Sequence, residues 1–247
     1  IGEEPELVEV HRRALAGGQD EVPVELGRRE EAVDVQLDRW TASHFLEEEA
    51  PDFLLYQWAD IDARHPLLGQ PAMWRSILAN YGLSVPPHTF GTFGEIALLE
   101  RRGAPVPLAL RVVGRDRVGI GDWIEPPESP DLLFASIRFS PTILGRLSVL
   151  LWRIEPVEID LQYADGRNLT FRILPETSEN GLLMNYLPSS MYELLNLFQG
   201  IRPSPVVRFR VRGPGTSSFQ RTLDIVWRSA PWIPPPSTPV HIGAIPP

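Results

Sequence analysis

The chain has 247 residues, a formal net charge of −9 and no cysteine. An acidic chain lacks the basic surface that contacts with phosphates require, so nucleic acid is excluded as a general partner. The absence of cysteine excludes disulfides, thiolate catalysis and cysteine-ligated metal centres. Because all 23 basic residues are arginine, a Schiff-base lysine and a phosphate-loop lysine are excluded as well.

The first half of the chain mixes helical and strand patterns. A helix is expected over residues 4–18, and the acid-rich residues 19–50 are expected to form a solvated face or a mobile arm. A buried strand is expected over 52–58, and a proline at a first helical position predicts a helix over 71–82. The remaining expected elements of this half are two strands, over residues 93–102 and 106–113.

The second half is richer in strands and contains one expected helix. Ser190 and Glu193 form a capping box ahead of an apolar run, and Gly200 ends that run, so a helix is expected between them. Strands of the right length and period are expected over residues 132–139, 157–174 (a hairpin), 206–212 and 222–227.

A proline-rich, charged segment at residues 125–130 is the best internal boundary. It divides an α+β region with an acidic N-terminal segment, residues 1–128, from an antiparallel β-sandwich-like region, residues 129–230. Residues 231–247 are rich in proline and are expected to form an extended tail.

The hairpin over residues 157–174 is the clearest pattern. Residues that pair across an antiparallel ladder point to the same face, and a two-residue loop would mix the apolar and polar faces. A three-residue loop, 165–167, keeps them apart and places Asp160 opposite Arg172. We therefore predict an odd-length loop with these two side chains paired on the outer side.

The strand patterns together predict a mainly β fold with a minor α+β N-terminal part. Several strands carry one apolar and one polar face, the turns are short and helices are few. These features are typical of an antiparallel β-sandwich or a jelly-roll-like fold with a few short helices.

The sharpest catalytic candidates are Asp60, Asp62 and His65, which follow directly on a predicted strand. Two carboxylates at this spacing can hold a divalent cation, as in metal-dependent sugar transfer. The alternative is a polar strand end whose side chains cap the following turn, and the commonness of the spacing favours it. We therefore predict no catalytic residue, no metal site and no cofactor, and whether the chain is an enzyme stays open.

Arginines alternate along residues 206–212 and offer a candidate binding surface. Arg208, Arg210 and Arg212 are expected to point outward while Val207, Phe209 and Val211 point inward. Guanidinium groups suit an anionic glycan or a lipid phosphate. The alternative, which we favour, is ordinary ion pairing with acids of neighbouring strands, namely Asp160, Glu158 and Asp224.

Aromatic side chains near predicted loops are candidate platforms for sugar stacking. Trp123 and Tyr186 are the candidates for ligand binding, and Trp232 is also expected to lie near a loop. Most large aromatic side chains in such a chain are expected to lie in the core.

The order of four segments carries a resemblance. These segments are WADIDARHPLLGQPAMWRSILANYGL, FGEIALLERR, LLFASIRFSPTILGRLSVLLWR and ENGLLMNYLPSSMYELLNLFQG. Over about residues 52–228, the pattern resembles the C-terminal soluble portion of large bacterial multi-pass membrane proteins. Some of those proteins look like membrane-embedded glycosyltransferases that use lipid-linked sugars.

The resemblance implies a strand-rich domain on the periplasmic or cell-surface side, tethered to an upstream transmembrane region of the same protein. It carries over no catalytic residues. We expect a non-catalytic, extracytoplasmic domain that binds or positions cell-envelope glycan. Two alternatives stay open: a purely structural or assembly domain, and a metal-dependent sugar-transfer or hydrolytic enzyme that uses Asp60 and Asp62.

Overall fold

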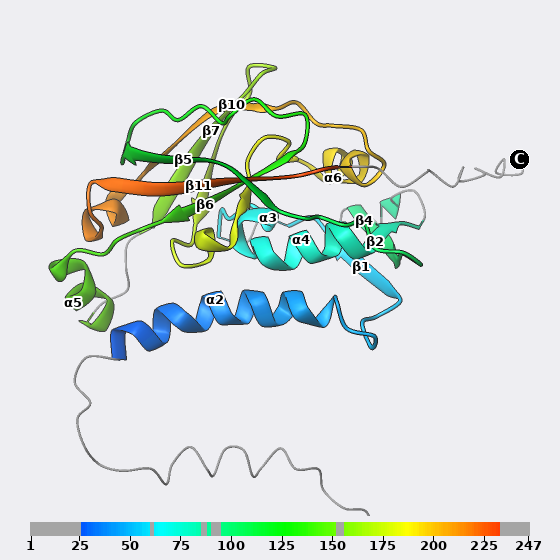
Figure 1. The fold of residues 1–247 in the computed structure, drawn as a ribbon, viewed down its shortest axis with the longest axis horizontal. Helices are drawn as coiled ribbons and strands as arrows, with labels where there is room; N and C mark the ends of the chain where they lie inside the picture. The colour runs from blue at the N-terminus through cyan, green and yellow to red at the C-terminus, as the bar shows by residue number, and fades with distance from the viewer. Residues whose placement is uncertain (1–25, 60–61, 85–87, 90–94, 152–155, 233–247) are drawn as a thin grey trace, which may run out of the picture.

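The computed structural model describes residues 26–59, 62–84, 88–89, 95–151 and 156–232 (Figure 1). The helix expected over residues 4–18, residue Asp60 and most of the tail lie outside these residues. No helix in the described part is both long and apolar enough to cross a membrane.

The strands form three sheets in which every pair is antiparallel. The first sheet contains β1 (Phe53–Gln57), β4 (Glu95–Arg101), β2 (Tyr81–Leu83) and β3 (His88–Thr89). The second has the order β10 (Val206–Arg212), β7 (Val157–Tyr163), β8 (Asn168–Ile173). The third has the order β5 (Arg111–Gly119), β11 (Thr222–Ala230), β6 (Leu132–Arg138), β9 (Leu182–Leu183).

The helices are few, and most of them are short. Those within the described residues are α2 (Leu26–His44), α3 (Pro66–Gly69), α4 (Pro71–Asn80), α5 (Ile143–Leu151) and α6 (Met191–Phe198), together with the 3₁₀ turns η2 (Thr177–Asn180) and η3 (Pro214–Ser218). The predicted mainly β fold is therefore confirmed. Helices α3 and α5 and strands β2, β3 and β9 had no counterpart in the sequence-based prediction. The helix expected over residues 71–82 ends at Asn80, and β5 begins later than the strand expected over residues 106–113.

The core lies where the apolar faces of the second and third sheets meet. Phe209 of β10 packs against Trp227 of β11, with ring centroids 6.1 Å apart. Both side chains are completely buried, as are Ile159 and Val211. Alternation along each strand thus leaves the opposite side of the second sheet for polar side chains. Core residues from both sides of segment 125–130 belong to one cluster.

The acid-rich segment was expected to be a solvated face or a mobile arm. Residues 26–44 form α2, so the mobile arm is wrong for them, whereas most of the side chains described over residues 35–49 are exposed or half-buried, as expected of a solvated face. Figure 1 shows α2 running below α4. Asp38 of α2 is 1% exposed, and its carboxylate accepts hydrogen bonds from the backbone N–H groups of Ala72 and Met73, both at 3.1 Å. It therefore caps the first turn of α4, whose own N-cap residue, Gln70, supplies no side-chain bond.

The hairpin β7–β8 has an odd loop, as predicted, but its register differs. The loop is residues 164–166, because the N–H of Tyr163 donates to the carbonyl of Arg167 at 2.9 Å. Gly166 has a φ of +89°, the left-handed conformation that ends a three-residue hairpin loop. Asp160 consequently faces Thr170, and the predicted pairing of Asp160 with Arg172 is wrong. The apolar pattern defines which face a residue is on, whereas the turn defines which partner it meets.

Candidate functional site

The outer side of the second sheet gathers most of the predicted binding residues. We call this surface the arginine face and define it as Trp123, Glu158, Asp160, Gln162, Arg172, Arg208, Arg210 and Arg212. These side chains come from β7, β8, β10 and the segment that precedes residue 124.

Strand β10 alternates as predicted from Arg208 onward, with Phe209 and Val211 buried. A register shift between Val206 and Arg208 marks a β-bulge. The bulge buries Val206 and leaves Val207 42% exposed, so the expectation that Val207 points inward is wrong.

Trp123 reaches the arginine face because its neighbour Ile124 pairs with the free edge of β10. The N–H of Ile124 donates to the carbonyl of Phe209 at 2.7 Å, and the N–H of Phe209 donates back at 2.9 Å. Ile124 is buried, so the preceding side chain points to the outer side. Trp123 is 39% exposed.

Two guanidinium groups lie over the Trp123 ring. The central carbons of Arg208 and Arg210 are each 4.7 Å from the ring centroid. Exposed cation–π contacts of this kind are worth about 0.5–1 kcal/mol each. The structure therefore brings together an aromatic platform and two of the three predicted arginines, which the sequence had suggested separately.

Asp160 lies at the centre of the arginine face. Its carboxylate accepts hydrogen bonds from Thr170 Oγ1 at 2.7 Å, Arg210 Nε at 2.8 Å and Arg212 Nε at 2.7 Å. Burial of the carboxyl group acts to raise its pKa, but the hydrogen bonds from Arg212, Thr170 and Arg210 outweigh burial and lower the pKa to about 2. Asp160 is therefore ionised at any physiological pH.

The predicted ion pairing is present for two of the three arginines. Arg212 also contacts Glu158 at 2.8 Å, whereas Arg208 donates to the neutral side chain of Gln162. Asp224, the third predicted acid, lies 3.7 Å from Arg117 on the third sheet. The arginine face holds four guanidinium groups and two carboxylates, so its charge is positive in a chain of net charge −9.

Tyr186 lies near the arginine face but is not part of it. The guanidinium carbon of Arg202 is 5.2 Å from its ring centroid. Tyr186 lines a groove of about 790 Å³ together with residues 125–130 and the start of β10. The lining of this groove includes Glu125, which follows Trp123 by two residues in the chain.

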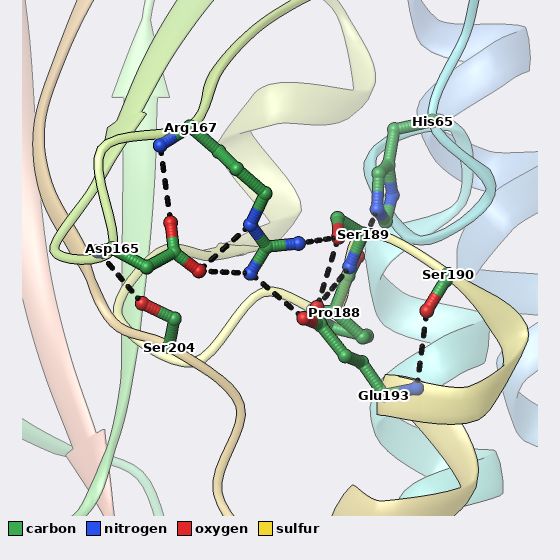
Figure 2. Close-up of polar contacts among 8 residues, drawn as sticks. All are labelled: His65, Asp165, Arg167, Pro188, Ser189, Ser190, Glu193 and Ser204. Carbon is green, nitrogen blue, oxygen red and sulfur yellow. Dashed lines mark hydrogen bonds and ion pairs between the residues drawn. The ribbon is translucent and has the colours of Figure 1, made fainter.

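His65 has a structural role, in agreement with the favoured capping interpretation. It is fully buried, its Nε2 is 2.6 Å from the carbonyl of Pro188, and its Nδ1 accepts from the N–H of Leu67 at 3.1 Å at the start of α3 (Figure 2). Desolvation by burial lowers its pKa to about 4, against the opposing effect of the bond to Pro188. The neutral imidazole therefore uses both nitrogens within the fold.

Asp62, the described carboxylate of the predicted metal pair, is exposed and lies 4.0 Å from Arg64. Within the described ranges, no three histidine, aspartate or glutamate side chains gather as metal ligands would. His65 does not join Asp62 in a common site, because its ring nitrogens point to Leu67 and Pro188.

Sequence reasoning missed the polar network around Arg167 at the hairpin tip (Figure 2). Arg167 donates to Asp165 Oδ2 at 2.7 Å, to Glu193 Oε1 at 2.7 Å and to the hydroxyl of Ser189. The other oxygen of Glu193 accepts from the N–H of Ser189 at 2.8 Å. The available signal was the capping box: its Ser190 bond to the N–H of Glu193 is present at 3.3 Å. The network joins the hairpin loop to the start of α6.

A comparison of the chain with models of protein families, with curated proteins and with solved structures finds no match. The function is therefore inferred from the geometry of the arginine face and from the sequence pattern.

Proposed function

We propose that this chain is a non-catalytic domain that binds an anionic cell-envelope glycan on the arginine face. The observation that carries the proposal is Trp123, which is 39% exposed and has the guanidinium groups of Arg208 and Arg210 over its ring. The exposed part of the indole ring offers an apolar surface to the C–H groups of a sugar, next to the guanidinium groups that lie over the ring. Guanidinium groups beside it can hold a sugar carboxylate or phosphate through paired hydrogen bonds.

Arg208 is the principal anion-binding residue in this proposal. Its hydrogen bond goes to a neutral amide, Gln162, whereas Arg210 and Arg212 contact the carboxylate of Asp160. If Arg208 gives up the amide of Gln162 for an anionic ligand, it gains an ion pair. If Arg210 or Arg212 gave up Asp160 for the ligand, the buried carboxylate of Asp160 would lose a partner. In this proposal, Arg208 contacts the ligand, whereas Arg210 and Arg212 stay bound to Asp160 and contribute positive charge to the arginine face.

The setting belongs to the same proposal. The domain lies outside the cytoplasm, beside an upstream transmembrane region of the same protein. Support comes from the resemblance of its segment order to the soluble portions of bacterial multi-pass membrane proteins.

A purely structural or assembly role is the second candidate function. It is favoured by the ion pairs of Asp160 with Arg210 at 2.8 Å and with Arg212 at 2.7 Å, which hold β10 to β7 without any ligand. On this reading the arginines serve only to join strands, and Trp123 covers their aliphatic stems.

The deciding experiment is calorimetric titration of the whole chain with a uronic-acid tetrasaccharide and with the neutral tetrasaccharide of the same linkage. We expect the acidic sugar to bind and the neutral one to bind at least tenfold more weakly. Trp123→Ala and Arg208→Gln should each weaken binding of the acidic sugar at least tenfold.

Arg117→Gln is the matched control, because Arg117 is an exposed arginine on a different sheet. This variant should bind as the parent does. If neither sugar binds at millimolar concentration, or if Trp123→Ala binds normally, the glycan function is wrong and the structural role is favoured.

A further inference from the structure

A second cavity is lined by residues that do not belong to the arginine face. It has a volume of about 500 Å³ and is enclosed by residues of α2, β1, α3 and α4 and by residues that follow β8. Its walls are mainly apolar and include Leu37, Met73, Trp74, Ile77 and Leu174. A volume of about 300–1,000 Å³ with apolar walls and a few polar groups is typical of sites for small ligands.

Two polar side chains of this cavity, those of Asp38 and His65, already have hydrogen-bond partners within the protein. Asp38 accepts hydrogen bonds from the N–H groups of Ala72 and Met73 and from Asn180 Nδ2 at 2.7 Å. His65 is neutral, and both its nitrogens are engaged. Neither side chain needs a ligand.

Arg64 is the exception. Its side chain lines the cavity and is 29% exposed, although its Nε is buried and has no hydrogen-bond partner among the described residues. Among the described residues, the carboxylate that approaches Arg64 is that of Asp62, which is 4.0 Å from a terminal nitrogen of Arg64, beyond hydrogen-bond length, and has a side chain that is 61% exposed. A guanidinium group in the wall of an apolar cavity is suited to pair with the carboxylate of a ligand.

The backbone beside Arg64 is strained. Asp62 and Ala63 have φ values of 53° and 57°, a left-handed conformation that is unfavourable for residues with a Cβ atom. The N–H of Arg172 donates to the carbonyl of Ala63 at 2.8 Å and holds this conformation in place. Strain that the surrounding structure maintains is frequent where a side chain must be presented to a ligand.

From the guanidinium group of Arg64 in the wall of an apolar cavity, we infer that this cavity binds an amphiphilic monocarboxylate. The carboxylate accepts hydrogen bonds from Arg64, and the aliphatic body packs against Met73, Trp74 and Ile77. A neutral amphiphile fills the same space but brings no charge to the guanidinium group. A cationic amphiphile is repelled by it.

The inference does not depend on the proposed glycan function, because no residue of the arginine face lines this cavity. The two ligands differ in chemistry, and Trp123→Ala should leave binding of the monocarboxylate unchanged.

Calorimetry of the whole chain with hexanoate, octanoate and decanoate, and with the alcohols of the same lengths, tests the inference. Affinity should rise about fourfold with each methylene group until the cavity is full. Each carboxylate should bind at least tenfold more tightly than its alcohol, and Arg64→Gln should remove this difference. Arg221→Gln, a change at an exposed arginine of another part of the chain, should have no effect.

Met73→Trp, which fills the cavity from α4, should abolish binding of both series. Equal affinities for the acids and alcohols would overturn the inference, as would an absence of binding for both. The comparison of acid with alcohol on the parent chain decides the matter even if Arg64→Gln fails to fold.

Discussion

Replacing Asp160 with asparagine removes the one carboxylate that holds Thr170, Arg210 and Arg212 together on the arginine face. The pKa of Asp160 is lowered from 3.8 to about 2, because hydrogen bonds from these three side chains outweigh the effect of burial. At 1.36 kcal/mol for each pKa unit, the ionised form contributes about 2 kcal/mol to the free energy of unfolding. We expect Asp160→Asn to lose at least this amount at pH 7.

The same shift dictates how the effect depends on pH. A carboxyl group with a lowered folded-state pKa stabilises the fold above its unfolded-state pKa, and this contribution disappears as the pH falls from about 4 towards 2. About half of the difference between parent and variant should therefore be gone at pH 3.

Urea unfolding of both chains at pH 7 and pH 3 measures these quantities. The matched control is Asp224→Asn, because Asp224 is 55% exposed and lies 3.7 Å from an exposed arginine. Removing such a surface pair should cost well under 1 kcal/mol, roughly within the error of the method. A difference between parent and Asp160→Asn that is below about 0.5 kcal/mol, or that stays the same at both pH values, would refute the reasoning.

Three further predictions concern the scaffold. The pKa of His65 is about 4 in the folded chain, so as the pH falls the imidazole takes up a proton in the unfolded chain before it does in the folded chain. The free energy of unfolding should therefore decrease as the pH drops from 6.5 to 4. The loss is about 3 kcal/mol, and urea unfolding of His65→Gln should show a flatter pH profile. Arg167→Gln should cost about 1 kcal/mol in urea unfolding, and much less in a chain that already carries Glu193→Gln, because the two residues contact each other at 2.7 Å. Gly166→Ala should lower the free energy of unfolding by about 1–2 kcal/mol, since the φ of +89° is unfavourable for alanine, and a thermal melt should show a lower Tm.

Local patterns in the sequence predicted the elements whose cause is local. Pro71 begins α4, Ser190 caps α6, and the alternation of Arg208 with Phe209 defines the two faces of β10. Each of these features depends on residues within a few positions of one another, so a single sequence contains the information.

Features that depend on contacts far along the chain were not predictable in this way. Asp38 caps a helix that begins 33 residues later. The acid-rich composition around it predicted only that its side chain would be exposed to solvent. The register of β7–β8 depended on the position of the loop, which lies at residues 164–166 and ends at the left-handed Gly166, one residue earlier than the predicted loop 165–167.

The candidate site was predicted in parts but not as a whole. Arg208, Arg210 and Trp123 were each proposed from the sequence, for separate reasons. Their meeting depends on the pairing of Ile124 with Phe209, a bridge between segments 85 residues apart. The alternation of apolar and polar residues along a strand does not indicate such a contact. The pairing of arginines with Asp160 and Glu158 was predictable, because side chains on the same face of neighbouring strands lie close together.

The central claim is that a glycan contacts Trp123 on the arginine face. The most direct measurement is the indole N–H resonance of Trp123 in a ¹H–¹⁵N spectrum, assigned by its loss in Trp123→Phe, during titration with the uronic-acid tetrasaccharide. We predict a saturable shift of this resonance that is absent in Arg208→Gln and with the neutral tetrasaccharide. A Trp123 resonance that stays in place at millimolar acidic sugar would contradict the claim.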